Sequence, residues 1–371
     1  MKTRRESNPT PDSPPPRLLS LDALRGFAMF WLIGGREFVL AVAGFVHPGM
    51  FDVLKTQLTH TKWLGFVAWD LVMPLFLFAV GVAMPLSLGT YSERKKPLGP
   101  TYRRIARRVI ALWLLGILIQ QLRYGPGNLE LFSNALQAIA VGYLVTSLAL
   151  LHLPVVGQCV LFAVLLLGYG ALLTFVPFGS HPGGTLEKTV NLARHVDEWV
   201  LGGFRRDHAF TWIVPSLGFS ATVLLGAMAG QLLKGGRPAR RRLVLLTAFG
   251  LACLAAGWIW NRQLPWNRYL WTSSMVLWAG GWSFLLLALF HLSIDVWGFK
   301  RWAFPFLVIG SNALLAYAID PVFDRASDAL AQTLLHQYPT YYAELLSSSL
   351  ELALIWMILR LLYRRGKYFR V

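Results

Sequence analysis

Charged residues are scarce in this sequence. Asp, Glu, Lys and Arg make up 14% of its 371 residues, whereas soluble domains carry about a quarter. Acidic residues are the rarer kind, with 18 against 35 Lys and Arg and a formal net charge of +17. A nucleic-acid binder would explain the charge but not the 55% of hydrophobic residues, so we expect no nucleic-acid partner. A multi-span membrane protein explains both, if basic residues gather in the loops on one side of the bilayer.

Cysteine is also nearly absent. Cys159 and Cys253 both lie inside apolar runs, which argues against a disulfide framework or a cysteine-ligated metal centre. His181, His195 and His208 share one long loop but lack metal-ligand spacing, so we expect no metal cofactor. The sequence contains no GxxxxGK[ST], HExxH or GxSxG motif, which removes the common phosphate-loop, zinc-protease and serine-hydrolase signatures.

Long apolar runs are what the sequence has instead. A helix needs about 20 mainly apolar residues to cross a bilayer, and ten segments approach this: 22–44, 68–88, 105–122, 134–152, 155–176, 213–233, 243–260, 271–294, 304–321 and 347–363. We predict an all-α polytopic membrane protein of about ten transmembrane helices. Its single transmembrane domain covers 17–371, after a polar, Pro-rich and therefore disordered tail over 1–16. An interfacial helix is expected near 324–335.

The basic residues indicate an orientation. With ten spans, most Lys and Arg residues fall on the side of both termini, which the positive-inside rule makes cytoplasmic. Contact with anionic lipid explains most of these clusters, and a few could also bind an anionic cofactor. The clusters are Arg94–Lys96, Arg103–Arg104, Arg107–Arg108, Arg240–Arg242 and Arg364–Arg365.

Charges inside the first span invite a functional or a structural explanation, because a charge at bilayer depth costs roughly 2.5–3.5 kcal/mol on insertion scales. Asp22 and Arg25 are three residues apart, so they share a helix face and can pair. The pair either locks the start of the span, or Arg25 grips a phosphate or carboxylate there. Arg36 and Glu37 follow two glycines at the outer end and mark either a polar site or the membrane exit.

Polar residues near the other outer span ends form a second group of candidates. His60 lies just before the second span, which begins near Asp70. It is either a solvated loop residue or a base, since imidazole titrates near neutral pH. Trp63 either anchors the membrane interface or stacks on a sugar. Interhelical hydrogen bonding or a polar interior accounts for the remaining candidates, Asn134, Gln137, Ser273 and Asn312.

Several stretches, taken in order, resemble the bacterial relatives of lysosomal heparan-α-glucosaminide N-acetyltransferase: Arg17–Gly26, His60–Trp63, Trp69–Pro74, Phe78–Pro85, Asn134–Ile139, Ala221–Gly226, Leu270–Ser274 and Gly310–Tyr317. The resemblance covers nearly everything after the tail. It implies a multi-span enzyme that takes acetyl-CoA from the cytoplasm and acetylates an amino sugar on the opposite face. It also implies that His60, ten residues before Asp70, is the catalytic histidine. Arg36 stands where the lysosomal member has asparagine.

The resemblance leads to roles for individual residues. His60 would deprotonate the acceptor or carry the acetyl group itself, with Asp70 orienting it and Glu37 also in the catalytic group. The CoA phosphates would be neutralised by basic residues, namely Arg25, Arg103, Arg104, Arg107 and Arg108. The acceptor would be contacted by Arg36, Trp63, Asn134, Gln137, Ser273 and Asn312.

These roles describe a transferase of the bacterial inner membrane, with the lipid bilayer as its surroundings. Acetyl-CoA is its co-substrate and an amino sugar or glycan its acceptor, and a homodimer is one option for its assembly. The alternative function is a transporter or flippase for a lipid-linked or amphipathic metabolite, which would use the same polar core without chemistry.

Overall fold

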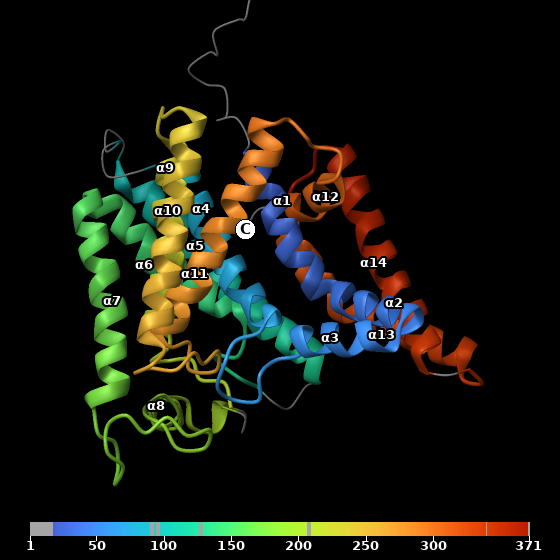
Figure 1. Ribbon diagram of the computed structural model, residues 1–371, viewed down its shortest axis with the longest axis horizontal. Coiled ribbons are helices and arrows are strands. Elements are labelled where there is room, and N and C mark those ends of the chain that lie inside the picture. The colour runs from blue at the N-terminus through green and yellow to red at the C-terminus, as the bar shows by residue number, and fades with distance from the viewer. Residues whose placement is uncertain are drawn as a thin grey trace, which may run out of the picture.

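The computed structural model describes residues 18–89, 93, 97–125, 129–205, 209–338 and 340–369, so the tail predicted over 1–16 lies outside the described residues. Within these ranges the chain is a bundle of helices (Figure 1). Two isolated bridges in the loop between α7 and α8, Phe178 with His181 and Leu186 with Asn191, are the β pairings that the described part shows. The predicted all-α class is confirmed.

The helices follow one another along the chain with short connections at most junctions. Their bounds are α1 Leu19–Phe30, η1 Trp31–Gly35, α2 Arg36–Val46, α3 Pro48–Leu58, η2 Ala68–Leu71, α4 Val72–Ser87, α5 Leu98–Tyr124, α6 Ala135–His152, α7 Val155–Phe175, α8 Leu192–Leu201, η4 Gly202–Phe204, α9 Ser216–Lys234, α10 Ala239–Trp260, α11 Ser273–Phe290, η5 His291–Val296, α12 Phe304–Ser311, α13 Ala313–Leu335 and α14 Thr340–Arg364.

Nine helical segments of the described chain are long and apolar enough to cross a membrane, or ten if the bent pair α12–α13 counts as one span. The predicted number is therefore confirmed, but the ninth span differs from its predicted form over 304–321. There α12 and α13 meet at 90°, and Asn312 between them has non-helical backbone angles of φ −135° and ψ 39°. Its side chain accepts from the Phe369 amide and donates to the Lys367 carbonyl.

A helix is present over 324–335, as expected, but it is the C-terminal part of α13 and not an element of its own. That it lies at the membrane interface stays a prediction. The segment is rich in Ala, Leu and Gln, which are strong helix formers, so the helix that begins after Asn312 has no local reason to stop before His336.

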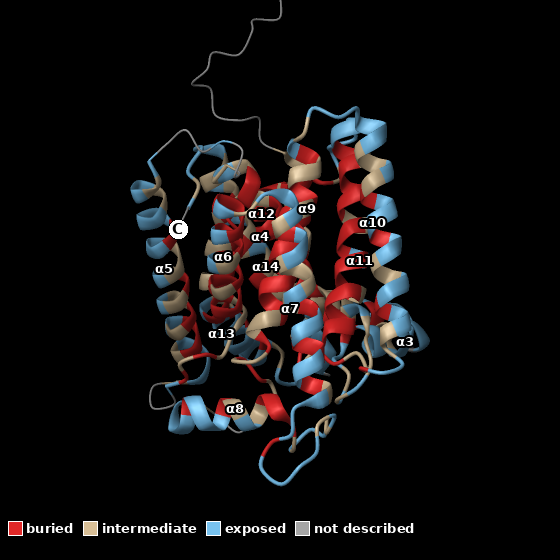
Figure 2. Cartoon of the chain, turned by 90° about the vertical axis from the view of Figure 1, so that its left-hand side faces the viewer, coloured by how far each residue is buried: buried red, intermediate tan, exposed pale blue. Residues whose placement is uncertain are grey.

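Burial separates the bundle into inner and outer helices (Figure 2). In the best apolar window of α4, α6, α9 and α11–η5, between 67% and 72% of residues are buried. The share is 17% to 28% in α5, α7, α10 and α14. Helices that are apolar all round and mostly exposed suit contact with lipid, so the outer helices form the ring that faces the bilayer and the inner ones form the core.

Two glycines bring α1 and α12 into backbone contact. A Cβ at Gly26 would overlap the carbonyl oxygen of Phe306, and a Cβ at Gly310 would overlap that of Asp22. Small residues at helix crossings permit this approach in membranes, where packing rather than hydrophobic burial joins helices. The contact fixes the first half of α1, and with it the position of Arg25.

The first span is broken near its middle. Ile33 and Gly34 leave the helical region, and Gly34 has φ +88°, a left-handed value that costs glycine little. The Glu351 carboxylate of α14 lies 2.5 Å from where a Gly34 Cβ would be. After the break the chain turns into α2 and α3, which deliver the loop that contains His60.

The bundle has two chemically different ends. At the basic end, Lys234 closes α9 and donates to the Pro85 carbonyl of α4 at 3.0 Å; the arginine-rich starts of α5 and α10 are also here. At the opposite end, called the α8 end, α3 and α8 lie across the helix termini (Figure 1). That the basic end faces the cytoplasm stays a prediction.

Replacing Gly310 with Ala tests the α1–α12 contact. The added methyl group overlaps backbone, so we expect the free energy of unfolding to fall by about 1–3 kcal/mol, measured as a lower Tm of the purified protein in detergent. Gly168→Ala on α7 is the matched control, because a Cβ there would meet nothing within 4 Å. An equal Tm for the two variants would contradict the contact.

Candidate functional site

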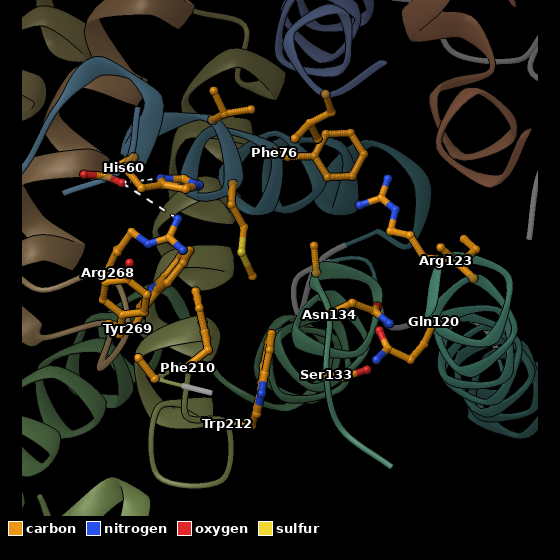
Figure 3. A pocket seen from close by; sticks show the side chains of 18 of the residues that line it. His60, Phe76, Gln120, Arg123, Ser133, Asn134, Phe210, Trp212, Arg268 and Tyr269 are labelled. Carbon is orange, nitrogen blue, oxygen red and sulfur yellow. Dashed lines mark hydrogen bonds and ion pairs between the residues drawn. The ribbon is translucent and has the colours of Figure 1, made fainter. Parts of the chain in front are cut away.

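A cavity of about 640 Å³ lies at the α8 end, where α4, α6, α9 and α11 begin and α5 ends (Figure 3). Aromatic and charged side chains from these termini share its wall. They include His60, Trp69, Asp70, Arg123, Glu130, Asn134, Phe210, Trp212, Arg268, Tyr269 and Tyr317. A largely apolar cavity with a few converging polar groups is the usual form of a small-molecule site.

His60 and Asp70 form a hydrogen-bonded pair on this wall. His60 Nδ1 lies 2.7 Å from Asp70 Oδ1, and the Asp70 side chain is fully buried while that of His60 is 38% exposed. Asp70 is fixed by the start of η2, where its Oδ2 accepts from the Val67 amide at 3.2 Å and from the Thr61 hydroxyl at 3.5 Å. The predicted proximity of the two residues is confirmed; their catalytic roles stay predictions.

Several groups act on the protonation of His60. Burial lowers its pKa below the ordinary value of 6.5, the hydrogen bond to Asp70 raises it, and the positive charges of Arg268 and Arg36 lower it. The net direction is downward. A neutral imidazole is therefore present at neutral pH, and this is the form that can accept a proton.

Arg36 and Glu37 support the His60 loop from α2. Arg36 Nε donates to the Leu58 carbonyl at the end of α3 at 2.6 Å, and its guanidinium lies 5.5 Å from the Trp69 ring centroid. Glu37 accepts from Arg36 at 2.8 Å and is half exposed. Neither residue lines the cavity, so the structure places both behind the loop. The roles predicted for them in substrate binding and catalysis stay predictions.

Trp63 also lies behind the wall. Its ring stacks on Tyr269 with centroids 5.4 Å apart, and its Nε1 donates to the Leu186 carbonyl at 2.7 Å. Tyr269 in turn donates to the Thr61 carbonyl at 3.1 Å. Trp63 therefore holds Tyr269 in place, and Tyr269 is the ring of the two that lines the cavity.

The predicted amide and hydroxyl ligands are separated by the fold. Asn134 lines the cavity while capping α6, with Oδ1 accepting from the Leu136 amide and Nδ2 donating to the Gly116 carbonyl. The Gln137 amide bonds the backbone of residues 131, 133 and 134. Ser273 donates to the Leu166 carbonyl. Of these candidates, Gln137, Ser273 and Asn312 are outside the cavity wall.

The five arginines predicted to hold the donor also divide into two groups. Arg103, Arg104 and Arg107 are exposed at the start of α5. Arg108 is partly buried with its guanidinium 4.5 Å from the Tyr143 ring centroid, and it repels Arg25 across the interior.

Arg25 and Arg108 are partly buried, and Asp22 partly compensates the charge of Arg25 at 4.0 Å. The Nε atoms of both arginines are buried without a hydrogen-bond partner in the part of the chain that the structure describes. Guanidinium groups with unused donors favour an anionic ligand.

Sequence reasoning missed part of the cavity wall. Arg268 is 3.9 Å from Asp70 Oδ1, and Arg123 pairs with Asp320 at 2.6 Å, which is itself hydrogen-bonded to Glu351. A charged residue inside an apolar run was the available signal for Glu351. Arg268 follows a Trp-rich loop segment and carries no such signal.

Comparisons with known proteins place the chain in a family. A family model described as heparan-alpha-glucosaminide N-acetyltransferase, catalytic, matches residues 17–250. The chain is similar to heparan-alpha-glucosaminide N-acetyltransferase of Homo sapiens, 25% identical over 419 residues, and to that of Mus musculus, 23% identical over 415 residues. Each match covers 96% of this chain and 60% of the relative, so the chain spans about 60% of the length of these curated relatives.

Proposed function

Because the chain belongs to the heparan-alpha-glucosaminide N-acetyltransferase catalytic family, we propose that it is a transmembrane N-acetyltransferase. It moves an acetyl group from acetyl-CoA on the cytoplasmic side to the amine of an amino sugar or glycan on the outer side of a bacterial inner membrane. The observation that carries the proposal is the His60–Asp70 pair, joined at 2.7 Å on the wall of the cavity.

The pair supplies the proton chemistry that acetyl transfer needs. The amine nitrogen attacks the thioester carbonyl carbon, so a C–N bond forms and the C–S bond breaks. His60 Nε2 takes the proton that the nitrogen loses and returns it to the departing thiolate, which leaves as the CoA thiol. Asp70 holds the ring by Nδ1 throughout. A route in which Nε2 first carries the acetyl group needs the same neutral nitrogen, so the geometry supports both routes equally.

Arg25 and Arg108 are the residues proposed to bind the donor, acetyl-CoA. Their positive charge and unused Nε donors suit the phosphates of CoA. On α5, Arg108 is 15 residues from Arg123 at the cavity, which corresponds to about 22 Å of helix. The phosphates would stay near the basic end, and the flexible pantetheine arm would carry the thioester through the core toward His60. This arrangement avoids moving a highly charged molecule across the bilayer.

The acceptor would occupy the cavity itself. Phe210, Trp212 and Tyr269 line it, and aromatic side chains suit the apolar face of a sugar ring. Asn134 keeps the cavity wall in shape through its two backbone bonds. The volume of about 640 Å³ falls within the range of small-molecule pockets.

Replacing His60 with Ala tests the chemistry. With radiolabelled acetyl-CoA and glucosamine as acceptor, we expect kcat to fall by roughly 10²–10⁴-fold, the contribution of a general base. Acetyl-CoA should still raise the Tm of the variant, because the donor is bound at the other end. His336→Ala, a change at an exposed residue after α13, is the matched control. A His60→Ala protein that acetylates at the wild-type rate would remove the catalytic role.

Replacing Arg108 with Gln tests the donor site. The change removes one of the two partly buried guanidinium groups, so we expect the KM for acetyl-CoA to rise by roughly tenfold or more, as for a lost charged hydrogen bond of about 1.5–3 kcal/mol. Arg103→Gln, which removes an exposed arginine one turn earlier, should change KM far less. Equal effects of the two variants would assign donor binding to the general basic surface instead.

A further inference from the structure

The charge environment of His60 gives a role to a residue that neither the sequence motifs nor the family match singles out. We propose that Arg268 is a positioning residue that neutralises Asp70 and keeps His60 as an uncharged imidazole with its proton on Nδ1. This inference rests on the proposed function, because it concerns the state of the base in that reaction. Arg268 lies beyond the region 17–250 that the family model matches.

Arg268 is held rigidly beside the pair (Figure 3). Its guanidinium carbon lies 4.4 Å from the Tyr269 ring centroid and 5.3 Å from that of Phe210, and its side chain is 16% exposed. Stacking between aromatic faces fixes the plane of a guanidinium group. Nη1 then points to Asp70 Oδ1 at 3.9 Å, the same oxygen that His60 Nδ1 contacts at 2.7 Å.

The contacts of Asp70 decide the tautomer of His60. The carboxylate receives the Val67 amide and the Thr61 hydroxyl on Oδ2 and the positive charge of Arg268 on Oδ1. These partners suit a carboxylate, which can only accept hydrogen bonds. His60 Nδ1 must therefore donate, which leaves the lone pair on Nε2 for the reaction.

Arg268 adds to the effect of burial, which is the largest cause of the lowered His60 pKa. A protonated His60 could not act as a base. With Arg268 present, a protonated His60 would be a second cation beside the single carboxylate of Asp70. Repulsion between the two cations therefore opposes protonation of His60.

A second arginine also acts on His60. Arg36 adds a further positive charge from α2, partly compensated by Glu37 at 2.8 Å. The pKa of His60 is accordingly lowered, first by burial and then by these arginines, against the raising effect of Asp70. The base form is lost only as the pH falls through that lowered pKa.

The test is the acid limb of the pH profile of kcat/KM, measured on the full-length protein with acetyl-CoA and glucosamine. Arg268→Gln removes the charge, so we expect the midpoint of the limb to move to higher pH, while activity on the plateau falls by less than the roughly 100-fold cost of losing a general base. Arg268→Lys keeps the charge and should retain a midpoint near that of the wild type. Asp70→Asn should move the limb to lower pH, because it removes the group that raises the His60 pKa.

Arg262→Gln is the matched control. This arginine belongs to the same connection between α10 and α11 and also lies over a ring, 4.7 Å from the Trp258 centroid, but it does not line the cavity. Its profile should equal that of the wild type. An Arg268→Gln profile that is unshifted, shifted to lower pH, or shifted equally by Arg262→Gln overturns the inference. A fully active His60→Ala protein overturns the proposed function instead.

A second measurement uses the unmodified chain, so it does not depend on how the Arg268 variants fold. In ¹⁵N-histidine spectra at pH 7, the signal that disappears in His60→Ala should be that of a neutral ring protonated on Nδ1. A charged ring, or a neutral ring protonated on Nε2, overturns the inference.

Discussion

The buried carboxylate of Asp70 is the contact on which the candidate site depends. A charge without exposure to water is tolerated only when donors and counter-charges surround it. Asp70 obtains them from the His60 loop, from the first turn of η2, and from Arg268, some 200 residues later in the chain. The bonds that stabilise the buried Asp70 carboxylate therefore also bring these three segments together. They orient one ring nitrogen of His60 toward the cavity.

The wider architecture separates two kinds of chemistry along the bundle. At the basic end, Arg25 of α1 and Arg108 of α5 have buried Nε donors without a hydrogen-bond partner among the described residues. At the α8 end, a cavity with aromatic walls includes His60. Between these regions α1 packs closely against α12 at Gly26, and the break at Ile33–Gly34 then redirects the chain toward the His60 loop. Such an arrangement suits a reaction whose donor and acceptor approach from opposite sides.

Sequence reasoning succeeded where the signal is local. Apolar runs predict spans because each helix must satisfy its own backbone in lipid, and the family resemblance points to His60 and Asp70 together across one short loop. Sequence reasoning failed where partners far apart in the sequence matter. The side chain of Asn312, at the bend, bonds to the backbone of residues 367 and 369. The side-chain amide of Gln137 is hydrogen-bonded to the backbone at the start of α6. The proposed role of Arg268 depends on its position beside Asp70.

The most direct test of the central claim places donor and acceptor on opposite sides of a membrane. The protein is reconstituted into sealed vesicles with glucosamine trapped inside, and radiolabelled acetyl-CoA is added outside only. Transfer through the bundle predicts acetylated glucosamine inside the vesicles, formed by the wild type and not by His60→Ala. Product that forms only when donor and acceptor share the same compartment would contradict a reaction carried across the bilayer.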